Sequence, residues 1–265
     1  MKFSEFDKQM RVYENFLDQT IEPGTYFVAR LDGRGFTKLT KREGYNKPFD
    51  INFRDLMLET TRTLMLSGFE VIYGYTQSDE ISLLFKKNTD IFNRKVRKYD
   101  SVLAGVASGS FSLRAGYLST FDCRMIPLPN LETVIDYFKW RQEDAGRNAL
   151  NGHCYWLLRK EGKSGKAADS ILKSTDYKFK VGFLREHGID YNTVPLWQKR
   201  GIGVWFGSTE RVSTNQLTGE DTTVERRVIV ENACLPTGDD YGALITDIID
   251  KSSEHLQDTE EMQVI

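Results

Sequence analysis

Two strand-like segments joined by a short polar bend are the feature of the sequence that most constrains its fold. Between residues 69 and 85, F-E-V-I-Y-G-Y is followed by T-Q-S-D-E and then by I-S-L-L-F. Apolar residues recur at every second position of the last segment, as in a sheet that packs more on one face than on the other. The sequence therefore predicts a strand, a bend and a returning strand, with Asp79 and Glu80 at the junction.

The adjacent carboxylates of Asp79 and Glu80 are expected to repel each other. Two unit charges about 4 Å apart, at an effective dielectric constant of about 20, repel by roughly 4 kcal/mol. Either a bound cation or exposure to solvent would offset this repulsion. The hairpin alone leaves both explanations open.

The segments around this hairpin predict an α+β core. A strand over residues 26–31 stops at D-G-R-G-F, and a helix begins after Asp50, a residue type that suits the N-cap position. A second helical pattern covers residues 92–106, and a short strand covers residues 124–127. The order strand, helix, strand, strand, helix, strand is the ferredoxin-like βαββαβ plan.

The second half of the chain predicts helices followed by a pair of strands. L-E-T-V-I-D-Y-F-K-W-R-Q-E-D begins a helix after Asn130, and further helical segments continue to about His187. G-I-G-V-W-F and R-R-V-I-V-E-N then form a β-pair, and the polar segment between them, residues 208–223, is expected to be flexible. The acidic residues 258–265 are expected to form a mobile tail.

Charge and cysteine content restrict the partners and the compartment. The 36 basic and 38 acidic residues give a net charge of −2, so a nucleic-acid partner would require basic residues concentrated locally. The three cysteines form no C-x-x-C pair, and with the three histidines they give no zinc-type spacing. No apolar run reaches the length of a membrane span, and the charged start M-K-F-S-E-F-D-K-Q-M does not suit a signal peptide. We therefore expect a cytoplasmic protein without a membrane partner.

Asp32, Asp79 and Glu80 are expected to converge at one edge of the sheet, because the strand that ends at Asp32 lies beside the hairpin in a βαββαβ plan. Carboxylates at neighbouring strand ends suit Mg²⁺, and two Mg²⁺ ions would hold both the attacking and the leaving oxygen of a phosphoryl transfer. The glycines of D-G-R-G-F let metal and phosphate approach the main chain closely. The alternative is structural, with D-G as an ordinary turn and S-D-E as a solvated hairpin tip. A P-loop is excluded, since E-G-K-S at residues 161–164 lacks the upstream glycine and has Leu157 in its place.

Basic residues cluster in two segments. F-N-R-K-V-R-K-Y, which includes Arg94, lies at the start of a predicted helix, where main-chain amides favour phosphate, and its Lys95 and Lys98 share one helix face. W-Q-K-R-G-I-G places Lys199 and Arg200 beside an indole, a combination that suits an RNA backbone and a stacked base. A solvated helix face and an ordinary strand start are the structural alternatives.

Five motifs, in order over roughly the first 160 residues, resemble the tRNA-His guanylyltransferase family. They are R-L-D-G-R-G-F, Y-N-K-P-F, Y-T-Q-S-D-E-I-S-L-L-F, F-N-R-K-V-R-K-Y and D-Y-F-K-W-R-Q-E-D. Enzymes of this family add nucleotides to RNA 5′ ends. The resemblance implies a polymerase-palm-like catalytic core over residues 1–135. It also implies a helical and β-hairpin C-terminal region over residues 136–265, involved in RNA binding and assembly, and a homotetramer.

The resemblance also implies roles for individual residues. Asp32 and Asp79, with the carbonyl of Gly33, are expected to hold two Mg²⁺ ions per active site, and Glu80 is similar to an adjacent acidic residue that activity in the family requires. The nucleotide-binding residues implied by the motifs are Asp32, Gly33, Arg34, Gly35, Phe36, Thr37, Lys47, Ser78, Asp79, Lys95 and Lys98.

One departure from the family pattern affects the choice of RNA. Where tRNA-His enzymes carry H-I-N-N, this chain has G-R-N-A at Gly146–Ala149. The missing histidine is associated with recognition of the tRNA-His anticodon, and its absence resembles the guanylyltransferase-like subgroup that repairs truncated tRNA 5′ ends. The segment W-Q-K-R-G-I-G also resembles that subgroup. Arg147 can hold a phosphate, so we expect tRNA contacts at Arg147, Lys199 and Arg200.

We therefore expect a nucleotidyltransferase that repairs 5′-truncated tRNA by templated 3′–5′ addition, with ATP or GTP activating the 5′ end and other nucleoside triphosphates as templated substrates. Addition of a single 5′ guanosine to tRNA-His is the main alternative. A palm-type nucleotide cyclase is less favoured, because no G-G-D-E-F motif occurs. A catalytically idle RNA-binding protein would have no reason to keep Asp32, Asp79 and Glu80 together.

Overall fold

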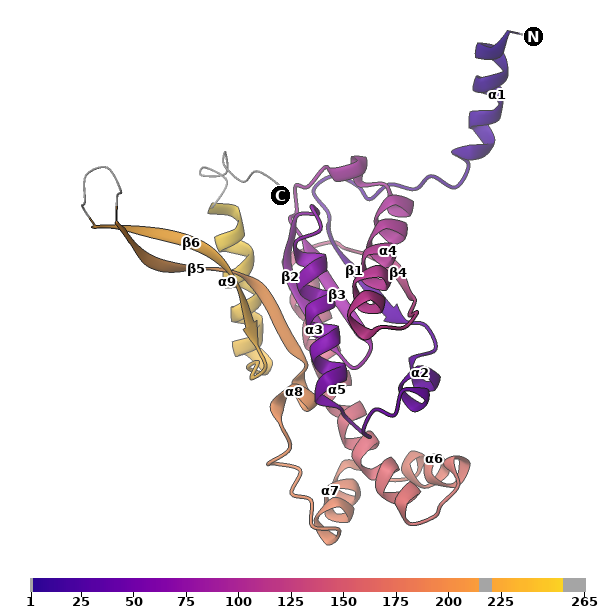
Figure 1. Cartoon of the computed structure of the whole chain (residues 1–265), viewed down its shortest axis with the longest axis vertical. Helices are drawn as coiled ribbons and strands as arrows, with labels where there is room; N and C mark the ends of the chain where they lie inside the picture. The colour runs from indigo at the N-terminus through magenta and orange to yellow at the C-terminus, as the bar shows by residue number, and fades with distance from the viewer. Residues whose placement is uncertain (1, 215–220, 255–265) are drawn as a thin grey trace.

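An antiparallel sheet of six strands is the framework of the computed structural model, which describes residues 2–214 and 221–254. Its strands are β1 (Tyr26–Gly33), β2 (Val71–Gln77), β3 (Glu80–Phe85), β4 (Phe121–Leu128), β5 (Ile202–Thr214) and β6 (Asp221–Asn232). They lie in the order β4-β1-β3-β2-β5-β6. The first four strands have the order of the ferredoxin-like βαββαβ plan, so this prediction is confirmed (Figure 1).

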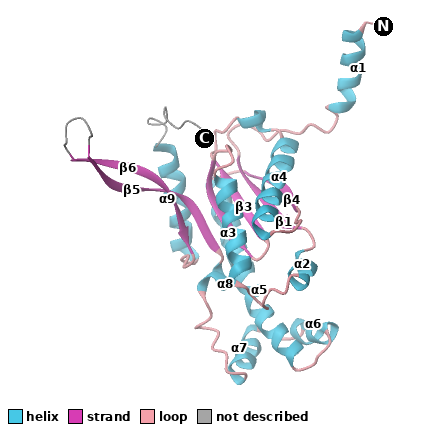
Figure 2. Ribbon diagram, in the orientation of Figure 1, coloured by secondary structure: helices cyan, strands magenta, loops and turns pink. Residues whose placement is uncertain are grey.

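The helices are α1 (Phe3–Glu14), α2 (Phe36–Arg42), α3 (Ile51–Met65), the 3₁₀ turn η1 (Ile91–Arg94), α4 (Val96–Ala115), α5 (Leu131–Lys160), α6 (Gly165–Lys173), α7 (Tyr177–Glu186), α8 (Leu196–Arg200) and α9 (Gly238–Glu254). α3 and α4 cover one face of the sheet, and α5 and α9 cover the other (Figure 2). α1 projects away from the sheet and buries none of its residues (Figure 1). None of the described helices has the length and apolar character needed to cross a membrane.

β3 is buried on both faces of the sheet. Ile81, Leu83 and Phe85 belong to the core under α3 and α4, and Leu84 belongs to the core under α5 and α9. A strand with two buried faces gains from apolar residues at consecutive positions, which explains why I-S-L-L-F alternates only in part. The predicted returning strand is therefore confirmed, and it lies in the interior of the molecule.

The helix predicted after Asp50 is also confirmed. The Asp50 carboxylate accepts hydrogen bonds from the N–H groups of Asn52 at 2.8 Å and Phe53 at 3.1 Å, which is an N-cap. Met57 and Leu64 then fall on the face of α3 that packs on the sheet. The N-cap thus fixes where α3 begins, and the apolar spacing fixes which face it buries.

Four helices lie where the sequence patterns predict none, namely α1, α2, α8 and α9. α2 follows D-G-R-G-F, where only a turn is expected. Gly35 adopts a left-handed conformation (φ 73°), which lets the chain reverse, and Phe36 and Leu39 then bury one side of the short helix. Burial of these two side chains outweighs the turn signal of the glycines.

The expected flexible connection at residues 208–223 is strand at 208–214 and 221–223, so the prediction is wrong there, while residues 215–220 lie outside the described part of the chain. β5 and β6 pair in register from Gly203 opposite Asn232 to Thr214 opposite Asp221. Main-chain pairing does not require apolar side chains, so it can continue through a polar sequence. The predicted mobile tail at residues 258–265 lies outside the described residues.

The two expected regions of the chain share structural elements. α5 runs through the expected boundary between residues 135 and 136, and β5 pairs with β2, so the C-terminal region extends the sheet of the N-terminal one. Tyr241 of α9 also packs in the same core as Tyr73 of β2, and their hydroxyl groups lie 2.9 Å apart. An RNA-binding role for residues 136–265 stays a prediction.

Arg94, which the sequence groups with the basic cluster, turns inward. Its guanidinium donates hydrogen bonds to five main-chain carbonyls, at Ile21, Glu22, Thr25, Lys87 and Thr89. It is 5% exposed and lies 4.7 Å from the centre of the Phe27 ring. Phe92, Asn93 and Arg94 all have a positive φ, and this run of left-handed residues is held by the guanidinium contacts.

We expect Arg94→Met to lower the free energy of unfolding by about 3 kcal/mol or more, because it removes a charged donor and leaves buried carbonyls short of partners. Arg97→Met is the matched control, since Arg97 is 46% exposed and pairs only with Asp18 among the described residues. The control should cost less than about 1 kcal/mol. Urea unfolding measures both variants, and equal losses would contradict the structural role of Arg94.

Candidate active site

The end of β1 and the β2–β3 turn meet at one edge of the sheet. Asp32 lies opposite Glu80 in the β1–β3 register, and the Gly33 N–H donates to the Asp79 carbonyl at 3.0 Å. The Ser78 hydroxyl, on a residue with φ 50°, donates to Oδ1 of Asp79 at 3.1 Å. The structure thus brings Asp32 and Asp79 together, as the strand order predicts.

Burial and mutual repulsion make this edge unfavourable for negative charge. Burial raises the pKa of Asp32, and the charges of Glu80 and Asp122 raise it further. Burial likewise raises the pKa of Asp79, and the charges of Asp32 and Glu80 add to the effect. Two partly desolvated carboxylates of this kind are stabilised by a cation between them.

Asp122 is a member of this edge that sequence reasoning missed. It lies on β4 directly opposite Asp32 and is exposed. The signal was the segment F-D-C-R-M-I-P, which places a carboxylate near the start of the strand that neighbours β1 in the βαββαβ plan.

The donor set at this edge fits Mg²⁺. Asp32 and Asp79 supply carboxylate oxygens, and Mg²⁺ typically takes few protein ligands and keeps waters and substrate phosphates. Among the described residues, no three or more His, Cys, Asp or Glu side chains form a group that could enclose a metal alone. An added Cβ at Gly33, the last residue of β1, would lie 2.6 Å from the Phe36 ring, so a larger residue there would require that buried ring to shift.

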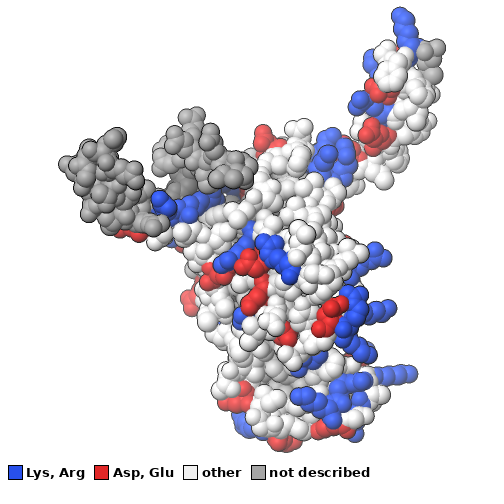
Figure 3. Space-filling model, viewed as in Figure 1, with Lys and Arg blue, Asp and Glu red and all other residues white. Residues whose placement is uncertain are grey.

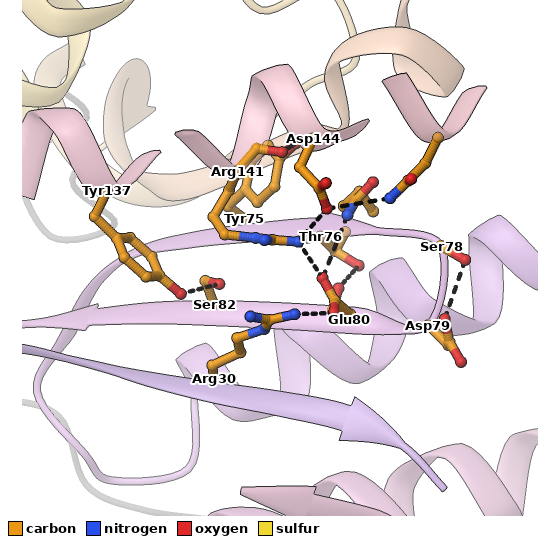
Figure 4. A network of polar contacts seen from close by, with 12 residues as sticks. Arg30, Tyr75, Thr76, Ser78, Asp79, Glu80, Ser82, Tyr137, Arg141 and Asp144 are labelled. Atoms are coloured by element: carbon orange, nitrogen blue, oxygen red, sulfur yellow. Dashed lines mark hydrogen bonds and ion pairs between the residues drawn. The ribbon is translucent and has the colours of Figure 1, made fainter. Parts of the chain in front are cut away.

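Glu80 faces away from Asp79, although the two are adjacent in the chain. Figure 4 shows its carboxylate directed toward Arg30 and Arg141, and Asp79 at the turn directed away from both. Arg30 is ion-paired to one oxygen of Glu80, and Nη2 of Arg141 lies 2.5 Å from the other. Gln77 also donates to Glu80, at 3.3 Å. Two arginines therefore offset the charge of Glu80. The sequence predicts that a bound metal cation or solvent offsets it, and the structure supports neither explanation for this residue.

Arg141 connects this ion-pair network to α5. Its side chain is only 3% exposed, and besides Glu80 it binds Asp144, one turn further along α5, at 3.0 Å. The Trp140 ring lies 4.6 Å from the Arg141 guanidinium and 6.0 Å from that of Arg30. In the sequence this segment stands out as a motif, and the i, i+3 spacing of Arg141 and Asp144 is the local signal for their pairing.

A cavity of about 740 Å³ opens beside Asp79. It lies between the β2–β3 turn, the segment from α2 to α3, and the adjoining parts of α5 and α8. Five of the predicted nucleotide-binding residues line it, namely Phe36, Thr37, Lys47, Ser78 and Asp79, together with the aromatic residues Phe49, Trp156 and Trp197. A space of this size and composition can hold a nucleotide.

Lys47 lines this cavity and carries a positive charge that can bind a phosphate group. Its Nζ donates to the Thr40 hydroxyl at 2.5 Å. Burial lowers the pKa of Lys47, and the charges of Asp79 and Asp50 act in the opposite direction. Lys47 has no ion pair among the described residues, so its charge is available to an anionic ligand.

The other predicted nucleotide-binding residues fall into two groups. Asp32, Gly33, Arg34 and Gly35 lie at the end of β1 or directly after it. Lys95 and Lys98 lie near the start of β1, since Lys95 forms a bridge with Thr20. An eight-residue strand spans about 25 Å, so the fold does not bring Lys95 and Lys98 to the Asp32–Asp79 edge of the same chain.

Lys95 and Lys98 also have local partners. Nζ of Lys95 lies 2.7 Å from the Asp18 carboxylate, which Arg97 shares, and Nζ of Lys98 lies 5.9 Å from the centre of the Phe92 ring. Their assignment to nucleotide phosphates stays a prediction.

The predicted RNA contacts differ in how free they are. Arg147 is 77% exposed and lies 3.6 Å from Asp144. Lys199 donates to the carbonyls of Tyr191 and Asn192, both at 3.1 Å, and Arg200 donates to the Leu235 carbonyl at 2.7 Å.

Gly146 stands where tRNA-His enzymes carry the histidine of H-I-N-N, and it lies where α5 approaches α8. A Cβ at Gly146 would lie 3.3 Å from the Lys199 carbonyl, and the Tyr191 hydroxyl donates to the Gly146 carbonyl at 3.1 Å. A larger side chain at this position would require α8 to move by a few tenths of an ångström, so glycine suits the close contact seen here.

Comparison with known proteins gives concordant results. Two family models match the chain, one described as tRNAHis guanylyltransferase over residues 7–129 and the other as Thg1 C terminal domain over residues 132–250. The tRNA(His) guanylyltransferase of Schizosaccharomyces pombe is 33% identical over 207 residues, which cover 74% of this chain and 78% of the relative.

Two solved structures are similar over most of their own length. That of tRNA(His) guanylyltransferase from Saccharomyces cerevisiae has a TM-score of 0.65 at 30% identity and covers 73% of this chain and 91% of the other. A bacterial tRNA(His) guanylyltransferase (Thg1)-like protein in complex with ATP has a TM-score of 0.70 at 26% identity and covers 92% and 98%. A structure of the same description contains GTP.

The raised pKa of Asp79 predicts a stability effect with a definite sign. The native chain holds the ionised carboxylate at a cost, so Asp79→Asn should raise the free energy of unfolding in metal-free buffer at neutral pH. This gain should shrink as the pH falls through the raised pKa, because wild-type Asp79 then also becomes neutral. Mg²⁺ at a hundredfold excess over its Kd should stabilise the wild type by about 2.7 kcal/mol and leave the variant unchanged.

Thermal unfolding with and without Mg²⁺, between pH 5 and pH 8, measures these differences. Asp169→Asn, which alters an exposed carboxylate on α6, is the control and should move neither quantity. A variant at Asp79 that lost stability without metal, and kept the Mg²⁺ response, would contradict the metal assignment.

Arg141→Met should destabilise the fold by about 3 kcal/mol, because it leaves Glu80 with one arginine instead of two and breaks a buried ion pair. Arg147→Met on the same helix should cost less than about 0.5 kcal/mol, since that side chain is exposed. Both arginines lie close to Asp144, so the pair of variants separates the Glu80 contact from a general effect on α5. Chemical unfolding at pH 7 measures both, and equal costs would rule out the Glu80 contact as the cause.

Proposed function

This chain belongs to the tRNAHis guanylyltransferase family, and we propose that it is a nucleotidyltransferase that extends the 5′ end of a tRNA. The observation that carries the proposal is the convergence of Asp32 and Asp79 beside a cavity of about 740 Å³ that Lys47 also lines. Phosphoryl transfer depends mainly on positioning and on the stabilisation of negative charge. Paired carboxylates and a lysine next to a nucleotide-sized space suit that chemistry.

Asp32 and Asp79, with the main-chain carbonyl of Gly33, are the residues that would hold Mg²⁺, two ions per site by the family resemblance. When bound, Mg²⁺ neutralises phosphate charge and orients the attacking and leaving oxygens. The raised pKa of both carboxyls supports this assignment, because a neighbouring cation would favour their ionised forms.

The remaining residues of the site would orient the nucleotide. Lys47, whose ammonium group has no ion pair among the described residues, would contact the triphosphate, and the turn from Gly33 to Thr37 would approach it through the main chain. Phe49, Trp156 and Trp197 offer ring faces to a base. A similar bacterial protein was solved with ATP and with GTP, which supports both as ligands here.

Glu80 enters this proposal as a residue that positions the turn. Its carboxylate is occupied by Arg30 and Arg141, so its effect on activity would reach the nucleotide through the adjacent Asp79. Its side chain would then be needed for the site without contacting the metal.

Addition of a guanosine to tRNA-His is the reaction that the names of the relatives support, in preference to the templated repair expected from sequence. Templated repair is the second candidate, and one observation favours it. Gly146 replaces the family histidine and packs against α8, so α5 presents no side chain there that could read an anticodon base. The similarity to a bacterial Thg1-like protein over 92% of this chain agrees with either reaction.

We further propose that residues 136–265 contribute to RNA binding and assembly, with Arg147 as the freest of the predicted contacts. A homotetramer and a cytoplasmic location are proposed on the family resemblance and on the sequence.

Nucleotide addition to two RNAs distinguishes the candidates. With Mg²⁺, ATP and labelled nucleotides, guanosine transfer to intact tRNA-His alone would support the first reaction. Extension of several 5′-truncated tRNAs, with the added base set by the opposite strand of the acceptor stem, would support the second. If repair is the reaction, exchanging the anticodon should change its rate by less than about tenfold, or roughly 1.4 kcal/mol.

Asp32→Ala and Asp79→Ala should abolish addition of either kind and leave tRNA affinity within about threefold, because RNA affinity comes from distributed phosphate contacts. Turnover of nucleotide without RNA would indicate a cyclase instead. Tight tRNA binding by a wild-type protein that adds nothing would indicate an idle RNA-binding protein.

A further inference from the structure

We infer that a strip of exposed cations across the mouth of the cavity binds the phosphate backbone of the RNA substrate and leads its 5′ end to Asp79. The inference rests on the proposed function and adds a surface that the predicted contacts at Arg147, Lys199 and Arg200 do not include. The basic strip consists of Lys38, Lys41, Arg42 and Arg114 on one side of the mouth and of Arg159, Lys160, Lys163 and Lys166 on the other.

The cavity joins the two sides of the basic strip. Lys41 of α2 and Arg159 of α5 both line it. Lys160, Lys163 and Lys166 follow Arg159 at the end of α5, in the next loop and at the start of α6.

The end of α4 is held beside α2. The rings of Phe36 and Phe111 lie 5.2 Å apart, and the Arg42 guanidinium lies 5.8 Å from the centre of the Tyr117 ring. These contacts hold the end of α4, which carries the exposed Arg114, beside α2. Because α2 and the end of α4 are held together by these ring contacts, the cations that they carry lie close to one another.

The charges of the basic strip are almost without carboxylate partners. Among the described residues, Arg42 alone of the eight has an ion pair, with Glu43 at 2.6 Å. By contrast, Lys95 and Arg97, which look equally basic in sequence, share the Asp18 carboxylate. In Figure 3, blue residues gather along the edge of the molecule where α2 and α6 lie. In a chain whose net charge is −2, this is a local excess of positive charge.

The position of the basic strip favours RNA as its ligand. Whatever binds there covers the entrance to the cavity that holds Asp79 and Lys47. A 5′ end that accepts a nucleotide must reach that same point, and the nucleotides behind it carry one negative charge each. Cations on both sides of the entrance could then contact successive phosphates of one strand, which gives affinity without sequence preference.

A salt titration of tRNA binding tests the inference. Lys38→Ala combined with Lys163→Ala removes one cation from each side of the mouth. At about 100 mM salt the double variant should bind tRNA about tenfold more weakly, and the slope of log K against log salt should fall by about 1.5 for two lost phosphate contacts. Lys8→Ala combined with Lys178→Ala is the matched control. It removes exposed lysines from α1 and α7 that have no ion pair among the described residues, and it should stay within about twofold of the wild type.

Thermal stabilisation by GTP and Mg²⁺ serves as the second readout and should be the same in both double variants, since the cavity and the carboxylates are intact. An unchanged salt slope in the Lys38/Lys163 variant would overturn the inference. If that variant also lost its binding of polyglutamate, the basic strip would instead be a site for an acidic protein. Wild-type protein that bound GTP and no tRNA would overturn the proposed function itself and the strip's role with it.

Discussion

The ion pairs of Glu80 with Arg30 and Arg141 are the interaction on which the arrangement of the site depends. Arg141 is 3% exposed, and a charge so deeply buried is tolerated only when its partners are in place. The network therefore fixes α5 against β1 and β3 at the same point where the β2–β3 turn emerges. Because Glu80 is neutralised from the α5 side, only Asp79 of the adjacent pair remains to share the edge with Asp32. Glu80 thus stabilises the fold, while Asp79 has no ion pair among the described residues.

This division follows from the geometry of the hairpin. Ser82 and Leu84 lie on the same face of β3 as Glu80, and they contact Tyr137 and the core under α5, respectively. Asp79, in the turn, is held by the Gly33 N–H and by Ser78, and its side chain borders the cavity. α5 thus carries both the residue that clamps the turn and, one to two turns further on, Gly146 and Arg147. The arginine that holds the turn in place and the predicted RNA contact at Arg147 therefore lie on one helix.

Most of the fold could be predicted from the sequence, because its signals are local. The alternation in β3, the N-cap at Asp50 and the apolar spacing of α3 each lie within a few residues. The partners of Glu80 could not be predicted in this way, since Arg30 and Arg141 lie 50 and 61 residues from it along the chain. α2 could not be predicted for another reason. Its seven residues contain about two helical turns, too few for the apolar spacing to outweigh the turn signal before them.

Residue type alone also does not show which cations are free to bind an anionic ligand. Arg94, Lys95 and Lys98 form one basic cluster in sequence, but each has a different environment in space. Arg94 is buried against five carbonyls, Lys95 is paired with Asp18, and Lys98 lies over an aromatic ring. The basic strip, in which only Arg42 has an ion pair among the described residues, lies elsewhere, on segments that look unremarkable in sequence because α2, the end of α4 and the end of α5 meet only after folding. A positive surface depends on cations that lack partners, and partnership is a property of the tertiary structure. Where the surface of this chain is positive therefore depends on which lysines and arginines lack a carboxylate partner, more than on where these residues are frequent in the sequence.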